Sequence, residues 1–346
     1  MGAHHQGRRY PPGLTPYGST VVASKHIEVV VAGVRPLTPR IKEFLLASAD
    51  GRPLPRYEPG AHVALHMVSQ ERGPIVRHYS LIGGPAGRDD PRHVYRIAVQ
   101  KEDRARGSAF IHDTFAPGTR LRVSAPVNDF PLDRRDACSL LIAGGIGVTP
   151  IVSMARSLAR RGCRYSVVYA GRDPGAMAYR DMLEEVAGDR VRFHYSDEAG
   201  VLDLRGLLAS QPDGTRAYVC GPAPLIAATH DAGAALGWDP GRVRSEVFTA
   251  GPTGDETAFE VELRRSGRTV RVGPDASILD ALRLADVPVL WDCARGECGL
   301  CPLPVVSADG PIDHRDRYLS AEERAAGETL CICVSRIRGT RLVLDA

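Results

Sequence analysis

Hydrophobic and polar positions alternate over short stretches in the first part of the chain, after an irregular beginning. Residues 1–24 are rich in Gly, Pro, His and Arg without periodicity, so an irregular extension is expected there. In His62–Val68, apolar side chains recur at every second position, as in a half-buried strand. Further strands are expected at His26–Val34, Arg96–Gln100 and Arg120–Val123. Short strands separated by Pro/Gly turns predict a small β-barrel over residues 25–132.

Strands and helices alternate between residues 133 and 250. Cys138–Ala143 is a continuous apolar run, which is typical of a strand that is buried on both faces. The other expected strands are Tyr165–Ala170, Val191–Tyr195 and Arg216–Val219, and the expected helices are residues 150–161, Tyr179–Val186 and Pro224–Leu236. This alternation predicts a doubly wound parallel sheet.

A third pattern follows residues 251–257, a Gly/Pro/Asp linker. Phe259–Leu263 and Thr269–Val272 alternate like the strands of a hairpin. Ser277–Ala285 is expected to be helical, with Ser277 as N-cap and an acidic residue three positions later. The chain closes with a strand at Arg341–Leu344. Residues 258–346 are therefore expected to form a separate domain.

Composition narrows the class of protein. The 346 residues are 43% hydrophobic and 25% charged, as in ordinary globular proteins, and the net charge of +3 does not favour nucleic acid as a partner. No apolar run approaches the ~18–20 residues that span a bilayer, and no secretory signal is visible. A cytoplasmic protein with reduced thiols is expected, with no membrane partner and as a monomer.

Five of the eight cysteines fall in the last 54 residues, which predicts a metal site. Cys293, Cys298 and Cys301 form a C-x4-C-x2-C run, the spacing of plant-type [2Fe–2S] proteins. Gly296 and Gly299 let backbone amides approach the cluster sulfurs and tune the reduction potential. A zinc site is the rival reading, but zinc loops usually pair two C-x2-C units and no second such pair is present. Buried, incidental cysteines are a second alternative.

The fourth cluster ligand is ambiguous from spacing. Cys331 and Cys333 lie 30 and 32 positions after Cys301. Residues two apart on a strand point to the same face, so orientation does not separate the two cysteines.

The string Arg77-His-Tyr79-Ser80-Leu81 carries the chemistry expected of a flavin site, and it is expected just after a strand. Arginine offers permanently charged donors to a phosphate, the tyrosine ring can pack on an isoalloxazine, and the serine hydroxyl can bond flavin N5. Gly107 and Ser108 can begin a helix whose amides bind a phosphate. Taken alone, the string is also compatible with an ordinary strand end.

Two Gly-containing turns each follow an expected strand and precede an expected helix. The first is Gly144-Gly145-Ile-Gly147-Val-Thr149-Pro150 and the second is Cys220-Gly221-Pro222. In an open parallel sheet, ligands bind at the carboxyl ends of the strands, so both turns predict a nucleotide site. The alternatives are a plain tight turn and, for the cysteine, a small core residue.

Arg172 and Asp173 follow the second strand of the same sheet. An arginine at this place can bind the 2′-phosphate of NADPH, whereas a neighbouring aspartate repels it. NADH is the expected nucleotide.

The order of these strings resembles that of the phthalate dioxygenase reductase family and of the related reductases of aromatic O-demethylase systems, over residues 26–346. Further matching strings are Asn128–Leu132, Glu246–Phe248, Asp313–Asp316, and Cys333–Arg336 with the ending Leu-Val-Leu-Asp345. Two positions depart from the family pattern. Gln100 stands where relatives often have Lys, which weakens one flavin contact, and Pro302 after Cys301 alters one amide hydrogen bond.

The resemblance implies a multi-domain α/β plus β fold. Its parts are a six-stranded antiparallel flavin-binding barrel, a doubly wound nucleotide domain and a C-terminal β-grasp ferredoxin-like domain. The implied cofactors are FMN, NADH and a [2Fe–2S] cluster, and the implied fourth cluster ligand is Cys333. The implied FMN contacts are Arg77, His78, Tyr79, Ser80, Val99, Gln100, Gly107, Ser108, Thr149 and Phe248. The implied nucleotide contacts are Gly144, Gly145, Gly147, Thr149, Pro150, Arg172, Asp173, Cys220, Gly221 and Pro222, with Ser80 and Cys220 as catalytic residues.

The function implied is electron transfer from NADH to FMN, then to the [2Fe–2S] cluster and to a terminal oxygenase. A Rieske non-haem iron oxygenase or O-demethylase is the expected partner, and a cytochrome P450 is the alternative. A flavin/iron–sulfur redox sensor is a remote third reading, since no DNA-binding or signalling module is visible.

Overall fold

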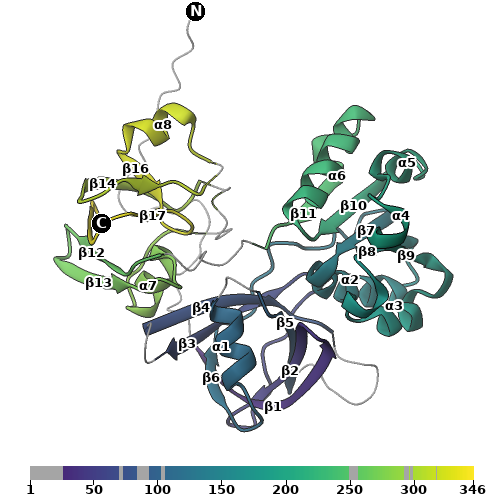
Figure 1. Ribbon diagram of the computed structural model, residues 1–346, viewed down its shortest axis with the longest axis horizontal. Helices are drawn as coiled ribbons and strands as arrows, with labels where there is room; N and C mark the ends of the chain where they lie inside the picture. The colour runs from purple at the N-terminus through teal and green to yellow at the C-terminus, as the bar shows by residue number, and fades with distance from the viewer. Residues whose placement is uncertain are drawn as a thin grey trace, which may run out of the picture.

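The described residues form three units, each built on a larger sheet of different construction, and the barrel lies between the other two units (Figure 1). The computed structural model describes residues 26–69, 73–83, 93–102, 106–248, 256–291, 296, 299–316 and 318–346. The expected N-terminal extension, most of the expected linker, Cys293 and Cys298 lie outside the described residues.

The first unit is a six-stranded antiparallel sheet with strand order β4-β3-β6-β1-β2-β5. Its elements are β1 (Ile27–Thr38), β2 (Ile41–Ser48), β3 (His62–Ser69), β4 (Gly73–Ser80), β5 (Val94–Gln100), α1 (Arg106–Thr114) and β6 (Arg120–Val123). Arg77–Ser80 lie within β4 and not after it, which corrects the expected boundary. His66, on the face of β3 expected to be solvated, is buried because the His26 ring packs edge-on against it with centroids 4.5 Å apart.

The second unit is a five-stranded parallel sheet with order β11-β10-β7-β8-β9. Its strands are β7 (Cys138–Gly144), β8 (Tyr165–Gly171), β9 (Val191–Tyr195), β10 (Thr215–Cys220) and β11 (Val243–Glu246). Its helices are α2 (Val148–Arg160), α3 (Arg180–Ala187), α4 (Ser196–Ala199), α5 (Leu204–Ala209) and α6 (Ala223–Ala235). In β7, Leu140 and Ile142 pack with α5 and α6, whereas Leu141 packs with α2 and α3. The sheet is therefore covered on both faces, and the doubly wound prediction is confirmed.

The third unit is a mixed five-stranded sheet with order β13-β12-β18-β14-β16, in which β12 and β18 run parallel. Its elements are β12 (Phe259–Leu263), β13 (Arg268–Val272), α7 (Ile278–Leu284), β14 (Pro302–Ala308), β15 (Ile312–Asp313), α8 (Ala321–Ala326), β16 (Thr329–Cys331), β17 (Arg336–Ile337) and β18 (Arg341–Leu344). The Ser277 hydroxyl accepts from the Asp280 amide and closes the expected capping box of α7. This β-grasp unit has its own apolar core.

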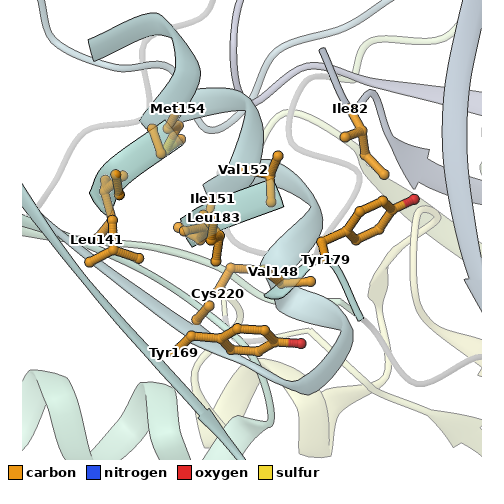
Figure 2. Packing of buried hydrophobic residues seen from close by; sticks show 14 of the residues in the cluster. Ile82, Leu141, Val148, Ile151, Val152, Met154, Tyr169, Tyr179, Leu183 and Cys220 are labelled. Carbon is orange, nitrogen blue, oxygen red and sulfur yellow. The ribbon is translucent and has the colours of Figure 1, made fainter. Parts of the chain in front are cut away.

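The barrel and the nucleotide unit share one apolar core. Ile82 and Phe130 from the barrel side belong to the same buried cluster as Val148, Ile151 and Tyr179 of the parallel-sheet unit. Figure 2 shows the Tyr179 ring beside Ile82, with α2 residues packed next to them. Within the described part of the chain, no helix is long and apolar enough to cross a membrane.

Candidate functional site

The flavin string lies along β4, paired with β3. Ser80 is opposite His62 and Tyr79 is opposite Val63 in the ladder. The Ser80 side chain is 4% exposed, and its hydroxyl has no hydrogen-bond partner among the described residues. Buried hydroxyls are normally bonded, so an orphaned one calls for an explanation. A flavin ring nitrogen held at this hydroxyl would supply the missing partner.

His78 and Tyr79 have many protein atoms around them, and each side chain still has part of its surface exposed to solvent. His78 is exposed and Tyr79 is partly exposed. Burial raises the pKa of the Tyr79 hydroxyl above its usual range, so the phenol stays neutral. Burial likewise lowers the pKa of His78, so its ring is neutral near pH 7. Neutral rings with one open face fit residues that a planar ligand covers.

Arg77 connects β4 with two other elements. A Cβ at Gly107, in the first turn of α1, would lie 2.6 Å from Arg77 Nε, so only glycine allows this close approach. At the end of its guanidinium, Arg77 Nη2 donates to Asp275 Oδ1 at 3.1 Å. The structure thus brings Arg77 and Gly107 together, as a phosphate site formed by arginine and a helix N-terminus requires.

Other residues expected to contact the flavin lie on several elements: β5, α1 and the segment after β11. Ser108 accepts a hydrogen bond from the Glu102 amide at 3.0 Å, and Gln100 Nε2 donates to Glu102 Oε1 at 2.9 Å. The Val99 side chain is fully buried in the barrel core, so it cannot face a ligand as the structure stands. Phe248 follows β11 and is 39% exposed. Flavin contacts by these residues stay predictions.

The two glycine turns of the nucleotide unit meet at the carboxyl edge of the sheet. β7 ends at Gly144 and β10 ends at Cys220, and the two strands are neighbours. A Cβ at Gly147 would lie 2.3 Å from the Cys220 carbonyl oxygen, and a Cβ at Gly221 would lie 2.9 Å from the Gly144 Cα. Glycine is required at these positions because the two turns press against each other.

Helices begin directly after both turns. A 3₁₀ turn at Gly145–Gly147 leads into α2, where the Thr149 hydroxyl donates to the Ile146 carbonyl at 3.1 Å. Pro150 lies in the first turn of α2, and Pro222 caps α6. Two helix N-termini at one sheet edge form the geometry that binds the phosphates of a dinucleotide.

Cys220 is fully buried in the core, beside Val148 and Tyr169 (Figure 2). A thiol without exposed surface reaches a nicotinamide only after its neighbours move. Its catalytic role stays a prediction, and the alternative of a small core residue describes its present packing.

Arg172 and Asp173 follow β8 at the same sheet edge. The Asp173 carboxylate accepts from the amides of Gly175 and Ala176, at 2.8 and 3.1 Å. Asp173 therefore caps a short 3₁₀ helix, a local role that the sequence did not suggest. Arg172 is exposed.

Three described cysteines, Cys301, Cys331 and Cys333, lie close together. Cys301 and Cys333 Sγ lie 3.1 Å apart, and both residues are buried. Hydrogen bonds from the Cys331 thiol first, and from Cys333 second, lower the pKa of Cys301 to about 3. Both candidate fourth ligands are therefore near Cys301. They do not share one strand face, because β16 ends at Cys331 and a turn follows it.

Gly296 and Gly299 of the cluster loop lie close to Asp316 and Tyr318, which follow the loop in the chain. Gly296 and Gly299 have φ of +76° and +73°, which favours glycine. A Cβ at Gly296 would lie 2.8 Å from Asp316 Cα, and a Cβ at Gly299 would lie 2.2 Å from the Tyr318 ring. Asp316 in turn accepts from the Leu319 amide at 2.8 Å. Thiols next to a loop held in this form fit the donor set of a [2Fe–2S] cluster.

Three residues of the site were not found by sequence reasoning. Asp275, Glu43 and Tyr179 make contacts between units, and each pairs with a residue far away in the chain. No local pattern distinguishes them from other polar residues. Within the described residues, no group of three or more His, Cys, Asp or Glu side chains has an arrangement that could hold a metal ion, and the expected ligands Cys293 and Cys298 lie outside these residues.

Two family models match the chain. The model described as "Dimethylamine monooxygenase subunit DmmA-like, N-terminal domain" matches residues 123–243. The model described as "2Fe-2S iron-sulfur cluster binding domain" matches residues 261–338. The second match confirms the prediction of an iron–sulfur domain.

Curated relatives match over nearly the whole length. The haem-dependent oxidative N-demethylase β subunit of Ectopseudomonas mendocina (strain ymp) is 40% identical over 92% of this chain and 98% of that protein. The vanillate O-demethylase oxidoreductase of Pseudomonas sp. (strain HR199 / DSM 7063) is 35% identical over 92% of this chain and 99% of its own.

Solved structures agree with these relatives. Phthalate dioxygenase reductase, described as modular for electron transfer from pyridine nucleotides to [2Fe–2S], is 33% identical with a TM-score of 0.78. The match covers 93% of this chain and 98% of that one. An intact type IV self-sufficient cytochrome P450 monooxygenase is 36% identical with a TM-score of 0.65, covering 98% of this chain and 43% of that one.

Proposed function

This chain belongs to the phthalate dioxygenase reductase-like family of oxygenase reductase subunits, and on that premise we propose that it uses FMN to pass electrons from NADH to a Rieske-type oxygenase. It is a flavin- and [2Fe–2S]-dependent oxidoreductase that serves an oxygenase. When bound, the flavin would supply two-electron chemistry toward the nicotinamide, and the cluster would supply one-electron transfer toward the oxygenase.

One observation carries the proposal: the flavin strand adjoins both other units. Arg77 on β4 contacts Asp275 of the ferredoxin unit. Three residues after Ser80, the carbonyl of Gly83 accepts from Arg156 Nη1 of the nucleotide unit at 3.1 Å. A flavin held on β4 would therefore adjoin both the nucleotide unit and the iron–sulfur domain.

The residues of this chain bind and orient the cofactors and perform no bond chemistry of their own. Arg77 and the amides of the α1 N-terminus would hold the FMN phosphate, and the Ser80 hydroxyl would bond flavin N5. The glycine edge formed by Gly144, Gly147 and Gly221, with the helix N-termini that follow it, would hold the pyrophosphate of NADH. Cys301 would supply one thiolate to the cluster.

The choice of FMN rests on the phosphate site at Arg77 and on the family resemblance. Flavin extracted from the purified protein should be FMN, at one per chain with two irons. FAD in the extract contradicts the FMN assignment, and a ratio far from one flavin to two irons contradicts the three-cofactor assignment.

The order of electron flow is tested by removing one cluster ligand. We expect Cys298→Ala to abolish cytochrome c reduction while NADH still bleaches the flavin. Cys163→Ala, outside the loop, should keep both activities. Survival of cytochrome c reduction in Cys298→Ala would show that the cluster is not on the path.

Cys333 is proposed as the fourth ligand in preference to Cys331, on the resemblance of its Cys-Val-Ser-Arg string. The matched pair Cys333→Ser and Cys331→Ser separates the two, because both thiols lie beside Cys301. Cys333→Ser should change the cluster absorption and EPR signal strongly, and Cys331→Ser should retain them. The reverse result assigns Cys331.

The class of oxygenase has a second candidate. A cytochrome P450 partner is favoured by one observation, because this whole chain matches part of a self-sufficient P450 at 36% identity. Substrate turnover with a Rieske oxygenase and with a P450, each mixed with this reductase and NADH, distinguishes the two. Light scattering of the same preparation checks the proposed monomer.

A further inference from the structure

An ion pair links the flavin strand to the ferredoxin unit across the chain. Arg77 Nη2 and Asp275 Oδ1 are 3.1 Å apart, although the residues are 198 positions apart in sequence. The Arg77 Nη1 group also donates to the Asp275 backbone carbonyl. The Asp275 side chain is 1% exposed, so solvent screens this pair little.

Asp275 is held in place by its own domain. It lies between β13 and α7, where Arg336 donates to the carbonyls of Gly273, at 3.1 Å, and of Ala276. The next residue but one, Ser277, closes the capping box of α7. The backbone on both sides of Asp275 is therefore bonded, and its carboxylate has a defined position.

The Nε–Nη2 edge of the Arg77 guanidinium, adjacent to the Nη1–Nη2 edge that faces Asp275, lies against α1. A Cβ at Gly107 would meet Nε at 2.6 Å and Nη2 at 2.8 Å, which places this edge against the first turn of the helix. Nη1 donates to the Val76 carbonyl at 2.8 Å. Asp275 and Val76 thus hold the Nη1–Nη2 end of the guanidinium, and Nε with the neighbouring side of Nη2 faces the helix N-terminus where the phosphate is proposed.

We propose that Asp275 is a positioning residue for the flavin phosphate: by holding Arg77, the ferredoxin domain completes the phosphate site of the neighbouring barrel. This inference rests on the proposed function, in which Arg77 binds the phosphate of FMN. It extends that function by making FMN retention depend on a residue of another domain.

Two physical arguments give the direction in which the Asp275 carboxylate changes the affinity for FMN. An arginine already oriented by a carboxylate loses less conformational freedom when it binds a phosphate. Linkage is reciprocal, so FMN bound at Arg77 strengthens the docking of the ferredoxin domain by the same factor. Direct repulsion between Asp275 and the phosphate predicts the opposite sign, in which removing the carboxylate tightens FMN binding.

The test compares FMN with riboflavin, which lacks the phosphate. Flavin-free protein that retains its cluster is titrated with each flavin by fluorescence quenching. We expect Asp275→Asn to weaken FMN binding about tenfold, within the usual range of coupling between sites, and to leave riboflavin binding unchanged. Asp275→Glu should recover part of the FMN affinity.

A matched control is available in the same domain. Asp345 pairs with Arg264 and Arg265 of the ferredoxin unit. Asp345→Asn should bind both flavins as the unchanged protein does. Unaltered riboflavin binding in Asp275→Asn shows that the barrel is folded, so a loss of FMN affinity alone reports the phosphate site.

Hydrogen exchange gives a second readout. FMN, but not riboflavin, should slow exchange of the α7 amides, and Asp275→Asn should remove this difference. Equal or tighter FMN binding in Asp275→Asn overturns the positioning role. If the unchanged protein binds FMN no better than riboflavin, the phosphate site in the proposed function fails as well, and the two failures are thereby distinguished.

Discussion

The barrel contacts the nucleotide domain through a continuous apolar core, whereas it contacts the ferredoxin domain through charged and polar side chains. Ile82 and Phe130 bury their side chains in the same cluster as residues of α2 and α3. On the other side, Arg77 pairs with Asp275, and His66 lies within the electrostatic reach of Asp280. The ferredoxin unit has a separate core.

A buried polar group reinforces the apolar interface. Glu43 of β2 is 3% exposed and accepts from Arg35 Nε at 3.2 Å. The Tyr179 hydroxyl of the nucleotide domain donates to Glu43 Oε2 at 2.9 Å. Tyr179 has a φ of +61°, a left-handed conformation that costs about 1 kcal/mol or more in a non-glycine residue. Packing and this hydrogen bond hold it there.

The difference between the interfaces matches what each redox step requires. Hydride transfer needs the reacting atoms about 3–3.5 Å apart, so flavin and nicotinamide must be held on one rigid unit. A single electron does not require atomic contact, so a polar interface suffices for the ferredoxin domain. We infer that the barrel and the nucleotide domain unfold as one unit and the ferredoxin domain as another.

The largest expected effect comes from the shared core. Phe130→Ala should lower the free energy of unfolding by about 4 kcal/mol, because a buried ring is lost and a cavity remains. Its ring also packs edge-on against Tyr218, with centroids 5.9 Å apart. Urea unfolding followed by fluorescence measures the loss in the barrel and the nucleotide domain together. The exposed Phe248 offers a matched control, Phe248→Ala, with a cost below about 1 kcal/mol.

Removing the buried negative charge of Glu43 should have the next largest effect on the free energy of unfolding. Glu43→Gln removes a buried negative charge whose Oε2 lies 3.6 Å from Nη1 of the buried Arg96. Breaking such a pair should cost about 2–3 kcal/mol in the same unfolding experiment. Glu58→Gln removes an exposed pair with Arg134 and should cost less than about 0.5 kcal/mol. Equal costs for the two variants would contradict a special role of the buried carboxylate.

Acid should lower the free energy of unfolding through His66, a residue of β3 that lies within electrostatic reach of Asp280 in the ferredoxin domain. Burial first, and then the neighbouring His26, lower the pKa of His66 to about 4, while Asp280 acts in the opposite direction. Arg283 and His78 lower it further. The folded protein therefore binds this proton less readily than the unfolded chain, whose histidine pKa is about 6.5. The stability is present above about pH 6.5 and is lost as the pH falls toward 4.

Between pH 7 and pH 5 this loss should amount to about 2 kcal/mol. Unfolding at both pH values measures it, and His66→Gln should reduce the difference by that amount. His230→Gln, at an exposed site in the nucleotide domain, serves as the control and should keep the full difference. An unchanged pH dependence in His66→Gln would remove His66 as the source.

The smallest expected effect measures how much the Tyr179–Glu43 hydrogen bond, apart from apolar packing, stabilises the interface between the barrel and the nucleotide domain. Tyr179→Phe keeps the ring in the shared core but loses the hydrogen bond to Glu43, so we expect a cost of about 1 kcal/mol. Tyr57→Phe, which loses a longer 3.3 Å bond to the Ile82 carbonyl, should cost less. A cost for Tyr179→Phe near that of Phe130→Ala would show that the hydrogen bond, and not packing, dominates this interface.

Local patterns predicted many elements well. Arg120–Val123, Val191–Tyr195 and Phe259–Leu263 begin and end where their alternation or apolar run predicts. The capping box at Ser277 was also predicted, since it depends on residues within one turn. The Arg77–Ser80 string was misplaced relative to its strand because its polar residues resemble a strand end, although the ladder continues to Ser80.

The sequence by itself determined the three units, because strand periodicity, glycine turns and cysteine spacing are local properties, and the resemblance of its strings to a known family indicated the cofactor of each unit. Only the tertiary structure decided which groups meet between units. Arg77 and Asp275 are 198 residues apart, and Tyr179 and Glu43 are 136 residues apart. It also placed both Cys331 and Cys333 next to Cys301, so the choice of Cys333 as fourth ligand stays a prediction from the resemblance. Such contacts depend on how whole domains pack, and no short stretch of sequence carries that information.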